Sequence, residues 1–122
     1  MHIAYWIVAG LLAAVYAFGG AKKLVQSQQQ LAPMMGWVDT VPMRQVRLIG
    51  LVEVLGGLGL ILPPLTGVAP GLAVAAAIGL AVVQIGAFRL HLSRHELGDL
   101  PLNVGLFALA VAAAWVGAIV WT

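Results

Sequence analysis

The chain has 122 residues, of which 62% are hydrophobic and 8% are charged, whereas about a quarter of the residues in a soluble domain are charged. This composition excludes a soluble globular domain and indicates an integral membrane protein. The net charge of +2 comes from basic residues that sit in pairs at the ends of apolar runs and form no patch or stripe, so nucleic-acid binding is not expected. The sequence has no cysteine, which excludes thiol redox chemistry and thiolate metal sites.

The first apolar run covers residues 3–24, and about 20 residues suffice to cross a bilayer. Two lysines follow the run, an order opposite to that of a cleaved signal peptide, although the tripeptide VYA at 15–17 has the form of a cleavage site. Residues 26–42, QSQQQLAPMMGWVDTVP, interrupt the hydrophobicity with glutamines and prolines. We expect a loop or a short interfacial helix there.

Three more spans follow. The second is predicted at residues 43–62 and should stop at Pro63 and Pro64, because proline lacks an amide donor and clashes with the preceding turn. The third and fourth are predicted at residues 70–91 and 101–121. Short links make neighbouring helices antiparallel. The expected fold is therefore all-α, an up-down four-helix bundle in the membrane within a single domain.

The basic residues give the bundle a direction. They flank only the first and third connections: Lys22, Lys23, Arg44, Arg47, Arg89 and Arg94. The positive-inside rule makes that side cytoplasmic and puts both termini on the non-cytoplasmic side. Aromatic residues agree, because they fall near the predicted outer ends: Tyr5, Trp6, Trp115 and Trp121. We expect a multi-pass protein of the cell (inner) membrane.

Glu53 is the one acid inside an apolar span. It lies about 15 Å along the helix from Met43, near the bilayer centre. A charged side chain at that depth costs several kcal/mol, roughly 3 on insertion scales, so it should be protonated, hydrogen-bonded or facing a hydrated cavity. Gly50 and Gly57 share its helix face, and glycines allow another helix to approach closely. Glu53 should therefore face the interior of the bundle.

Other polar residues fall in the same half of the membrane. Gln84 and His91 are seven residues apart on one face of the third span, Asn103 begins the fourth, and Tyr16 precedes the first lysine pair by about two turns. Such convergence in an apolar bundle is typical of a small-molecule pocket. The predicted ligand-binding residues are Tyr16, Glu53, Gln84, His91 and Asn103, with Glu53 and His91 as catalytic, proton-handling groups. The alternative is a network of interhelical hydrogen bonds that only fixes helix register.

His91 and His95 are spaced i, i+4, so on a continued helix their imidazoles would share a metal. The pattern is short and lies where a span leaves the membrane, where charged and polar anchors are ordinary. We therefore predict no metal site.

Three stretches together resemble the DoxX-like family of small four-helix bacterial membrane proteins. They are GGAKKL at 19–24, IGLVEVLGGLGLILP at 49–63 and GAFRLHLSRHE at 86–96. The resemblance implies a four-span bundle and points to Glu53 and His91 as recurring polar positions. It also implies association with membrane oxidoreductases, since the family takes its name from proteins associated with a thiosulfate:quinone oxidoreductase.

Three functions remain open from the sequence. The first is a membrane subunit that binds a quinone or another lipophilic molecule inside the bundle and supports an oxidoreductase partner that supplies electrons. The second is a stand-alone enzyme that performs acid-base chemistry on a lipophilic substrate through Glu53. The third is a structural or assembly protein whose small-residue faces pack against a partner or a second copy.

Overall fold

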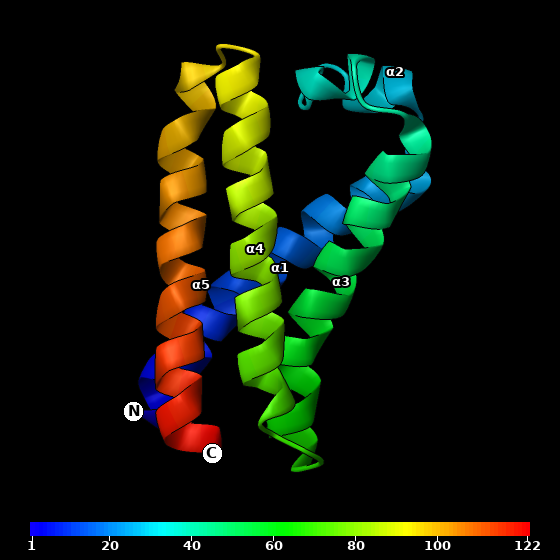
Figure 1. The fold of residues 1–122 in the computed structure, drawn as a ribbon. Helices are drawn as coiled ribbons and strands as arrows, with labels where there is room; N and C mark the ends of the chain where they lie inside the picture. The colour runs from blue at the N-terminus through cyan, green and yellow to red at the C-terminus, as the bar shows by residue number, and fades with distance from the viewer.

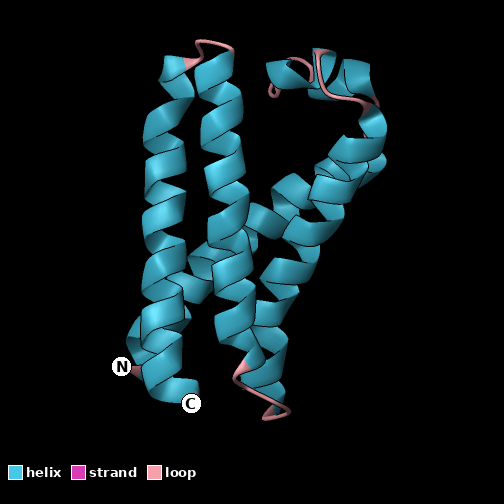
Figure 2. Ribbon diagram, in the orientation of Figure 1, coloured by secondary structure: helices cyan, strands magenta, loops and turns pink.

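The computed structural model describes the backbone of residues 1–122 and every side chain except that of Asp99. Its elements, in chain order, are α1 (His2–Val25), α2 (Gln28–Leu31), η1 (Gly36–Asp39), α3 (Met43–Thr66), α4 (Leu72–Ser93), η2 (Leu97–Asp99) and α5 (Leu100–Trp121). The described residues contain no strand (Figure 2). Helices α1, α3, α4 and α5 are each long and apolar enough to cross a membrane. The prediction of an all-α protein with four membrane-spanning helices is confirmed.

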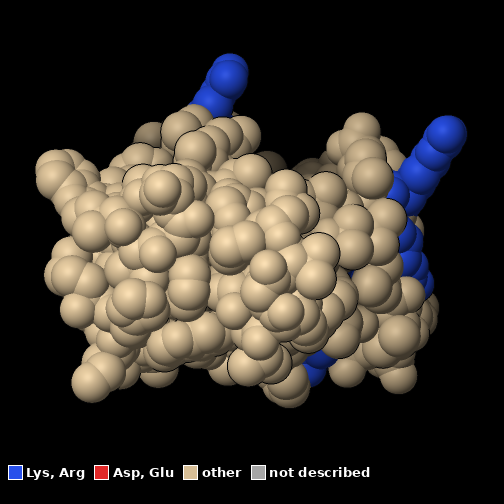
Figure 3. Space-filling model, turned by 90° about the horizontal axis from the view of Figure 1, so that it is seen from below, with Lys and Arg blue, Asp and Glu red and all other residues tan. Residues whose placement is uncertain are grey.

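The four long helices form a ring in which each packs mainly on two others, and a hydrogen bond from Gln84 of α4 to Tyr16 of α1 crosses the ring. Helix α1 packs mainly on α3 and α4 packs mainly on α5, while α3 also contacts α4 and α1 contacts α5. Figure 1 shows α4 and α5 side by side and α3 leaning away from α4 toward the upper end, where α2 and η1 lie. Both termini lie at the lower end of that view. Figure 3 looks onto this end and shows no acid, and basic side chains only at the margins. That this end faces away from the cytoplasm stays a prediction.

Each long helix buries one seam of residues three or four positions apart. In α5 this seam runs through Asn103, Leu106, Ala110, Ala113 and Gly117. The opposite faces are apolar too and remain exposed, as Leu48, Leu55 and Leu62 of α3 illustrate. Spacings of three and four place residues on one side of a helix. The seams therefore form the interior of the bundle, and the exposed leucines form a surface suited to lipid.

The backbones of α1 and α3 come very close together at a pair of glycines. A Cβ added at Gly20 would lie 2.7 Å from the carbonyl oxygen of Gly50, and one added at Gly50 would lie 2.7 Å from the carbonyl oxygen of Gly20. Real Cβ atoms essentially never come this close to another heavy atom. The two backbones touch directly because neither residue has a side chain.

Helix α3 does not stop at its prolines, so the predicted end of the second span at Pro63 is wrong. The helix continues to Thr66, and Gly67 follows with φ +74°. Because Pro64 has no amide hydrogen, the carbonyl of Leu60 loses its partner within the helix. The hydroxyl of Tyr5 on α1 donates to that carbonyl at 2.6 Å. A donor from a neighbouring helix thus allows proline inside a membrane helix.

Residues 26–42, hereafter the cap segment, fold as two short helices rather than as a plain loop. Ser27 caps α2: its hydroxyl accepts from the amide of Gln30, whose side chain accepts from the amide of Ser27. Leu31, Trp37 and Val38 are buried and pack together with Val46 at the start of α3. The cap segment therefore lies against the upper end of the bundle.

The close contact at Gly20 predicts that alanine substitutions at Gly19 and Gly20 change the stability of the protein differently. Gly20→Ala should destabilise the protein by about 1–3 kcal/mol, because the new methyl group meets a backbone oxygen that cannot move independently. Gly19→Ala is the matched control, since a Cβ there has nothing within 4 Å and alanine favours the helix by about 1 kcal/mol. Thermal unfolding in detergent measures both. Equal melting temperatures for the two variants would contradict direct contact between the two backbones.

Candidate functional site

A cavity of about 570 Å³ lies between the four long helices, beneath the cap segment. Its polar lining consists of side chains from the inner seams: Tyr16, Lys23, Glu53, Gln84, His91 and Asn103. Each is at most 8% exposed. The structure thus brings together all five residues predicted to bind a ligand and adds a sixth, Lys23. Their role in binding stays a prediction.

Glu53 is paired with Lys23. The ammonium of Lys23 donates to a carboxylate oxygen of Glu53, and both side chains are buried. Side chains of a helix lean toward its N-terminus, so Lys23 reaches from the last turn of α1 inward to Glu53. From the sequence, Lys23 was expected only to mark the cytoplasmic side. Its spacing of seven from the buried Tyr16 was the signal that it shares the inner seam of α1.

Two further contacts hold Lys23 in place. The guanidinium of Arg47 donates to the carbonyl of Lys23 at 2.6 Å and to that of Gln26 at 2.5 Å, which satisfies carbonyls left open at the end of α1. The ammonium of Lys23 also lies 5.7 Å from the centre of the Trp37 ring, within range of a cation-π interaction. α3 and the cap segment together position the buried cation.

The side-chain amides of Gln84 and Asn103 leave hydrogen-bonding atoms without partners. Gln84 donates through Nε2 to the hydroxyl of Tyr16 at 2.6 Å. Its Oε1 atom, and Nδ2 of Asn103, are buried and have no hydrogen-bond partner within the described part of the chain. A buried polar group without a partner costs about 1–3 kcal/mol. Both side chains line the cavity, so its wall holds one acceptor and one donor that the described part of the chain leaves unpaired.

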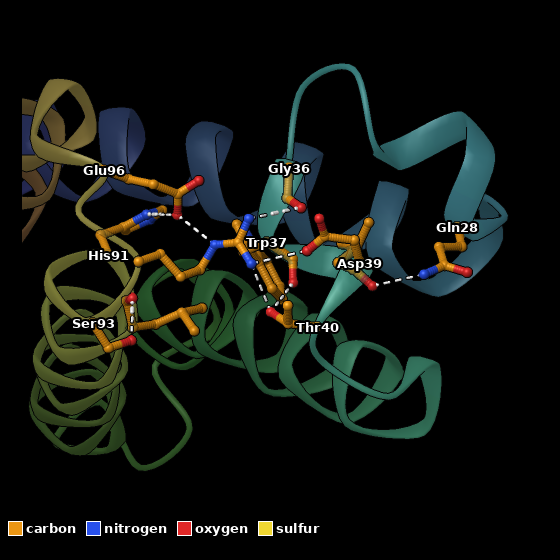
Figure 4. Close-up of polar contacts among 11 residues, drawn as sticks. Gln28, Gly36, Trp37, Asp39, Thr40, His91, Ser93 and Glu96 are labelled. Atoms are coloured by element: carbon orange, nitrogen blue, oxygen red, sulfur yellow. Dashed lines mark hydrogen bonds and ion pairs between the residues drawn. The ribbon is translucent and has the colours of Figure 1, made fainter.

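His91 belongs to a network that joins α4 to the cap segment (Figure 4). Its Nδ1 lies 3.1 Å from a carboxylate oxygen of Glu96, which also accepts from Arg94 at 2.9 Å. Arg94 in turn donates to Asp39 at 2.9 Å and to Thr40 at 2.7 Å. The hydrogen bond from Arg94, and secondly that from His91, lower the pKa of Glu96 below its ordinary value. This network, unforeseen in the sequence, ties His91, which lines the cavity, to the cap segment.

The geometry considered for a shared metal between His91 and His95 is not formed. Helix α4 ends at Ser93, and His95 lies beyond it with φ +56°. His95 is exposed, whereas His91 is buried. The two imidazoles therefore do not stand on successive turns of one helix.

The cavity is not sealed from the lipid-facing surface. Val15 and Phe18 of α1 and Leu102 of α5 line it, yet they are 46%, 63% and 63% exposed. The rest of its wall is largely apolar, including Met34 and Met35 of the cap segment. An occupant with an apolar tail and a polar head would match this arrangement.

The buried ion pair predicts strong coupling between its two members. Lys23→Met should destabilise the protein by about 3–5 kcal/mol, because it leaves a carboxylate buried without its cation. The double variant Lys23→Met/Glu53→Leu should recover most of that loss. Lys22→Met is the control, because its ammonium lies over the exposed Phe18 ring. Additive losses in unfolding measurements would show that the two charges do not interact.

The lowered pKa of Glu96 predicts that the attachment of the cap segment to the end of α4 through Arg94 weakens in acid. Because the folded-state pKa of Glu96 is lowered, its contribution is fully present above the ordinary glutamate pKa of about 4.3 and is lost as the pH falls through the lower folded value. Hydrogen exchange of residues 36–40, corrected for intrinsic rates, should be constant from pH 7 to about 5 and faster below about 4. Glu96→Gln should show fast exchange already at pH 7. Equal exchange in both proteins at pH 7 would contradict this role of Glu96.

Comparison with known proteins identifies the family of this bundle. The family model of the DoxX-like family matches residues 7–113, from the first turns of α1 to the fourth turn of α5. No curated protein and no solved structure matches the chain significantly. The family match covers most of the sequence, including every polar side chain of the cavity. The chain is a member of the DoxX-like family.

Proposed function

We propose that this protein binds a lipophilic molecule with a polar head group in its central cavity. The observation that carries the proposal is the pair of unpartnered amide atoms, Oε1 of Gln84 and Nδ2 of Asn103, in a cavity lined otherwise mainly by apolar side chains. A head group that both donates and accepts a hydrogen bond would satisfy the two amides. Its tail would leave past Phe18 and Leu102 into the lipid.

A quinone with an isoprenoid tail fits these requirements. A ring carbonyl can accept from Nδ2 of Asn103, and in the reduced form a ring hydroxyl can donate to Oε1 of Gln84. Reduction of a quinone consumes two electrons and two protons. The electrons would come from an oxidoreductase partner. Protons would pass through His91 and through Glu53, the latter by way of Lys23, whose ammonium donates to its carboxylate. The family membership supports this reading.

The two other functions are less well supported. As a stand-alone acid-base enzyme, the protein would need Glu53 to approach a substrate, but its carboxylate is held by Lys23. As a purely structural protein, it would gain nothing from a 570 Å³ cavity with unpartnered amides, because each unpaired group reduces stability by about 1–3 kcal/mol.

Two glycines of α4 provide a test with a matched control. Gly86 lines the cavity, Gly79 does not, and a Cβ at either position has nothing within 4 Å. Binding of a benzoquinone with a short isoprenoid tail is measured by native mass spectrometry in mild detergent. Gly86→Leu should lower the affinity at least tenfold, about 1.4 kcal/mol, because the leucine side chain fills the cavity. Gly79→Leu should bind like the unmodified protein.

Asn103→Leu tests the head-group contact separately. It removes the unpartnered donor and should weaken binding by about 1–3 kcal/mol, while the protein itself becomes no less stable. Unchanged binding in both Gly86→Leu and Asn103→Leu would contradict the proposal. So would the absence of any lipophilic molecule bound to the protein as isolated from its membrane, if the added quinone also fails to bind.

A further inference from the structure

A second groove lies on the outer surface, where the end of α1 meets the start of α3. It encloses about 560 Å³ and is lined by Leu24, Arg44, Gln45, Arg47, Leu48 and Leu51. None of these residues lines the central cavity. The groove is therefore a separate feature, and its occupant does not depend on the function proposed for the cavity.

The groove is positively charged and has no acid of its own. The exposed Arg44 forms no hydrogen bond or ion pair within the described part of the chain. Arg47 uses Nη1 for the two carbonyls at the end of α1, which leaves its other guanidinium nitrogens free. The acids with described side chains are all engaged elsewhere: Asp39 and Glu96 contact Arg94, and Glu53 contacts Lys23. No acid with a described side chain is therefore available to pair with the arginines of the groove, which leaves them open to an anion from outside the chain.

Below the arginines the groove is apolar. Arg44, Leu48 and Leu51 lie at i, i+4 and i+7 and so share one face of α3. Leu51 stands about 10 Å further along the helix than Arg44. Leu48 and Leu51 are 60% and 44% exposed, and Leu24 closes the other side of the groove. A cationic rim above an apolar wall, at the end of a membrane-spanning helix, is complementary to the anionic head and acyl chain of a phospholipid.

We propose that this groove binds one anionic phospholipid from the leaflet on the side of the cap segment. Its phosphate lies between Arg44 and Arg47, where guanidinium groups form charge-assisted hydrogen bonds with phosphate oxygens. Gln45 contacts the remainder of the head group, and one acyl chain lies along Leu48 and Leu51. Basic pockets at the ends of membrane helices bind anionic head groups in this way. A lipid here stabilises the packing of α1 on α3 through Arg47, which also donates hydrogen bonds to the carbonyls of Lys23 and Gln26 at the end of α1.

Native mass spectrometry of the full-length protein tests the site. The protein is offered equal, limiting amounts of phosphatidylglycerol and phosphatidylcholine in detergent. Phosphatidylglycerol should bind preferentially. Arg44→Gln should reduce that preference about fivefold, equivalent to about 1 kcal/mol. Arg89→Gln is the matched control, because Arg89 is likewise exposed, near the same end of the bundle, but does not line the groove. It should keep the preference unchanged.

Two further arms distinguish a whole phospholipid from a free phosphate and from a purely ionic attraction. Leu48→Gln should weaken binding of both phospholipids, since it disturbs the acyl-chain contact while both arginines remain. Soluble glycerol 3-phosphate, at the same concentration as the lipid, should not compete. Equal binding of the two phospholipids, an equal loss in Arg44→Gln and Arg89→Gln, or full competition by glycerol 3-phosphate would each overturn the proposal. Melting temperatures of the variants in lipid-free detergent verify that all are folded.

Discussion

A charged carboxylate inside a membrane needs a partner from the protein itself, and the architecture of this bundle depends on how Glu53 obtains one. Lys23 reaches it only because α1 and α3 approach until the backbones of Gly20 and Gly50 touch. A larger residue at either position would push the two helices apart and lengthen the distance that Lys23 has to span to reach Glu53. The close packing of small residues and the pairing of buried charges therefore depend on each other.

The close packing of α1 on α3 also accounts for the cavity. Since α1 is held against α3 and α4 against α5, the space between these two pairs near the cap segment remains open. The inner seams carry polar side chains at this level and apolar ones elsewhere, as Gln84 and Ala77 of α4 show. The cap segment closes the upper end through Arg94. Buried charged and amide side chains are thus confined to one half of an otherwise largely apolar bundle.

The sequence predicted what depends on local pattern. Hydrophobic runs located the four helices, and spacings of three, four and seven placed Glu53, Gln84 and His91 on inner faces. Lys23 was missed because a lysine beside Lys22 at a helix end fits the positive-inside rule equally well. The continuation of α3 through Pro64 and the link from Arg94 to Asp39 were also missed. Both depend on partners more than fifty residues away, which no local pattern reveals.

The pairing of Lys23 with Glu53 in a lipid bilayer is the central claim, and solid-state NMR tests it directly. The protein is prepared with ¹⁵N in lysine side chains and ¹³C in glutamate carboxylates, and Lys23→Met assigns the signal. A buried ion pair predicts a dipolar coupling between the two side chains that corresponds to contact within about 4 Å. A Glu53 carboxyl signal without coupling to any lysine nitrogen would contradict it.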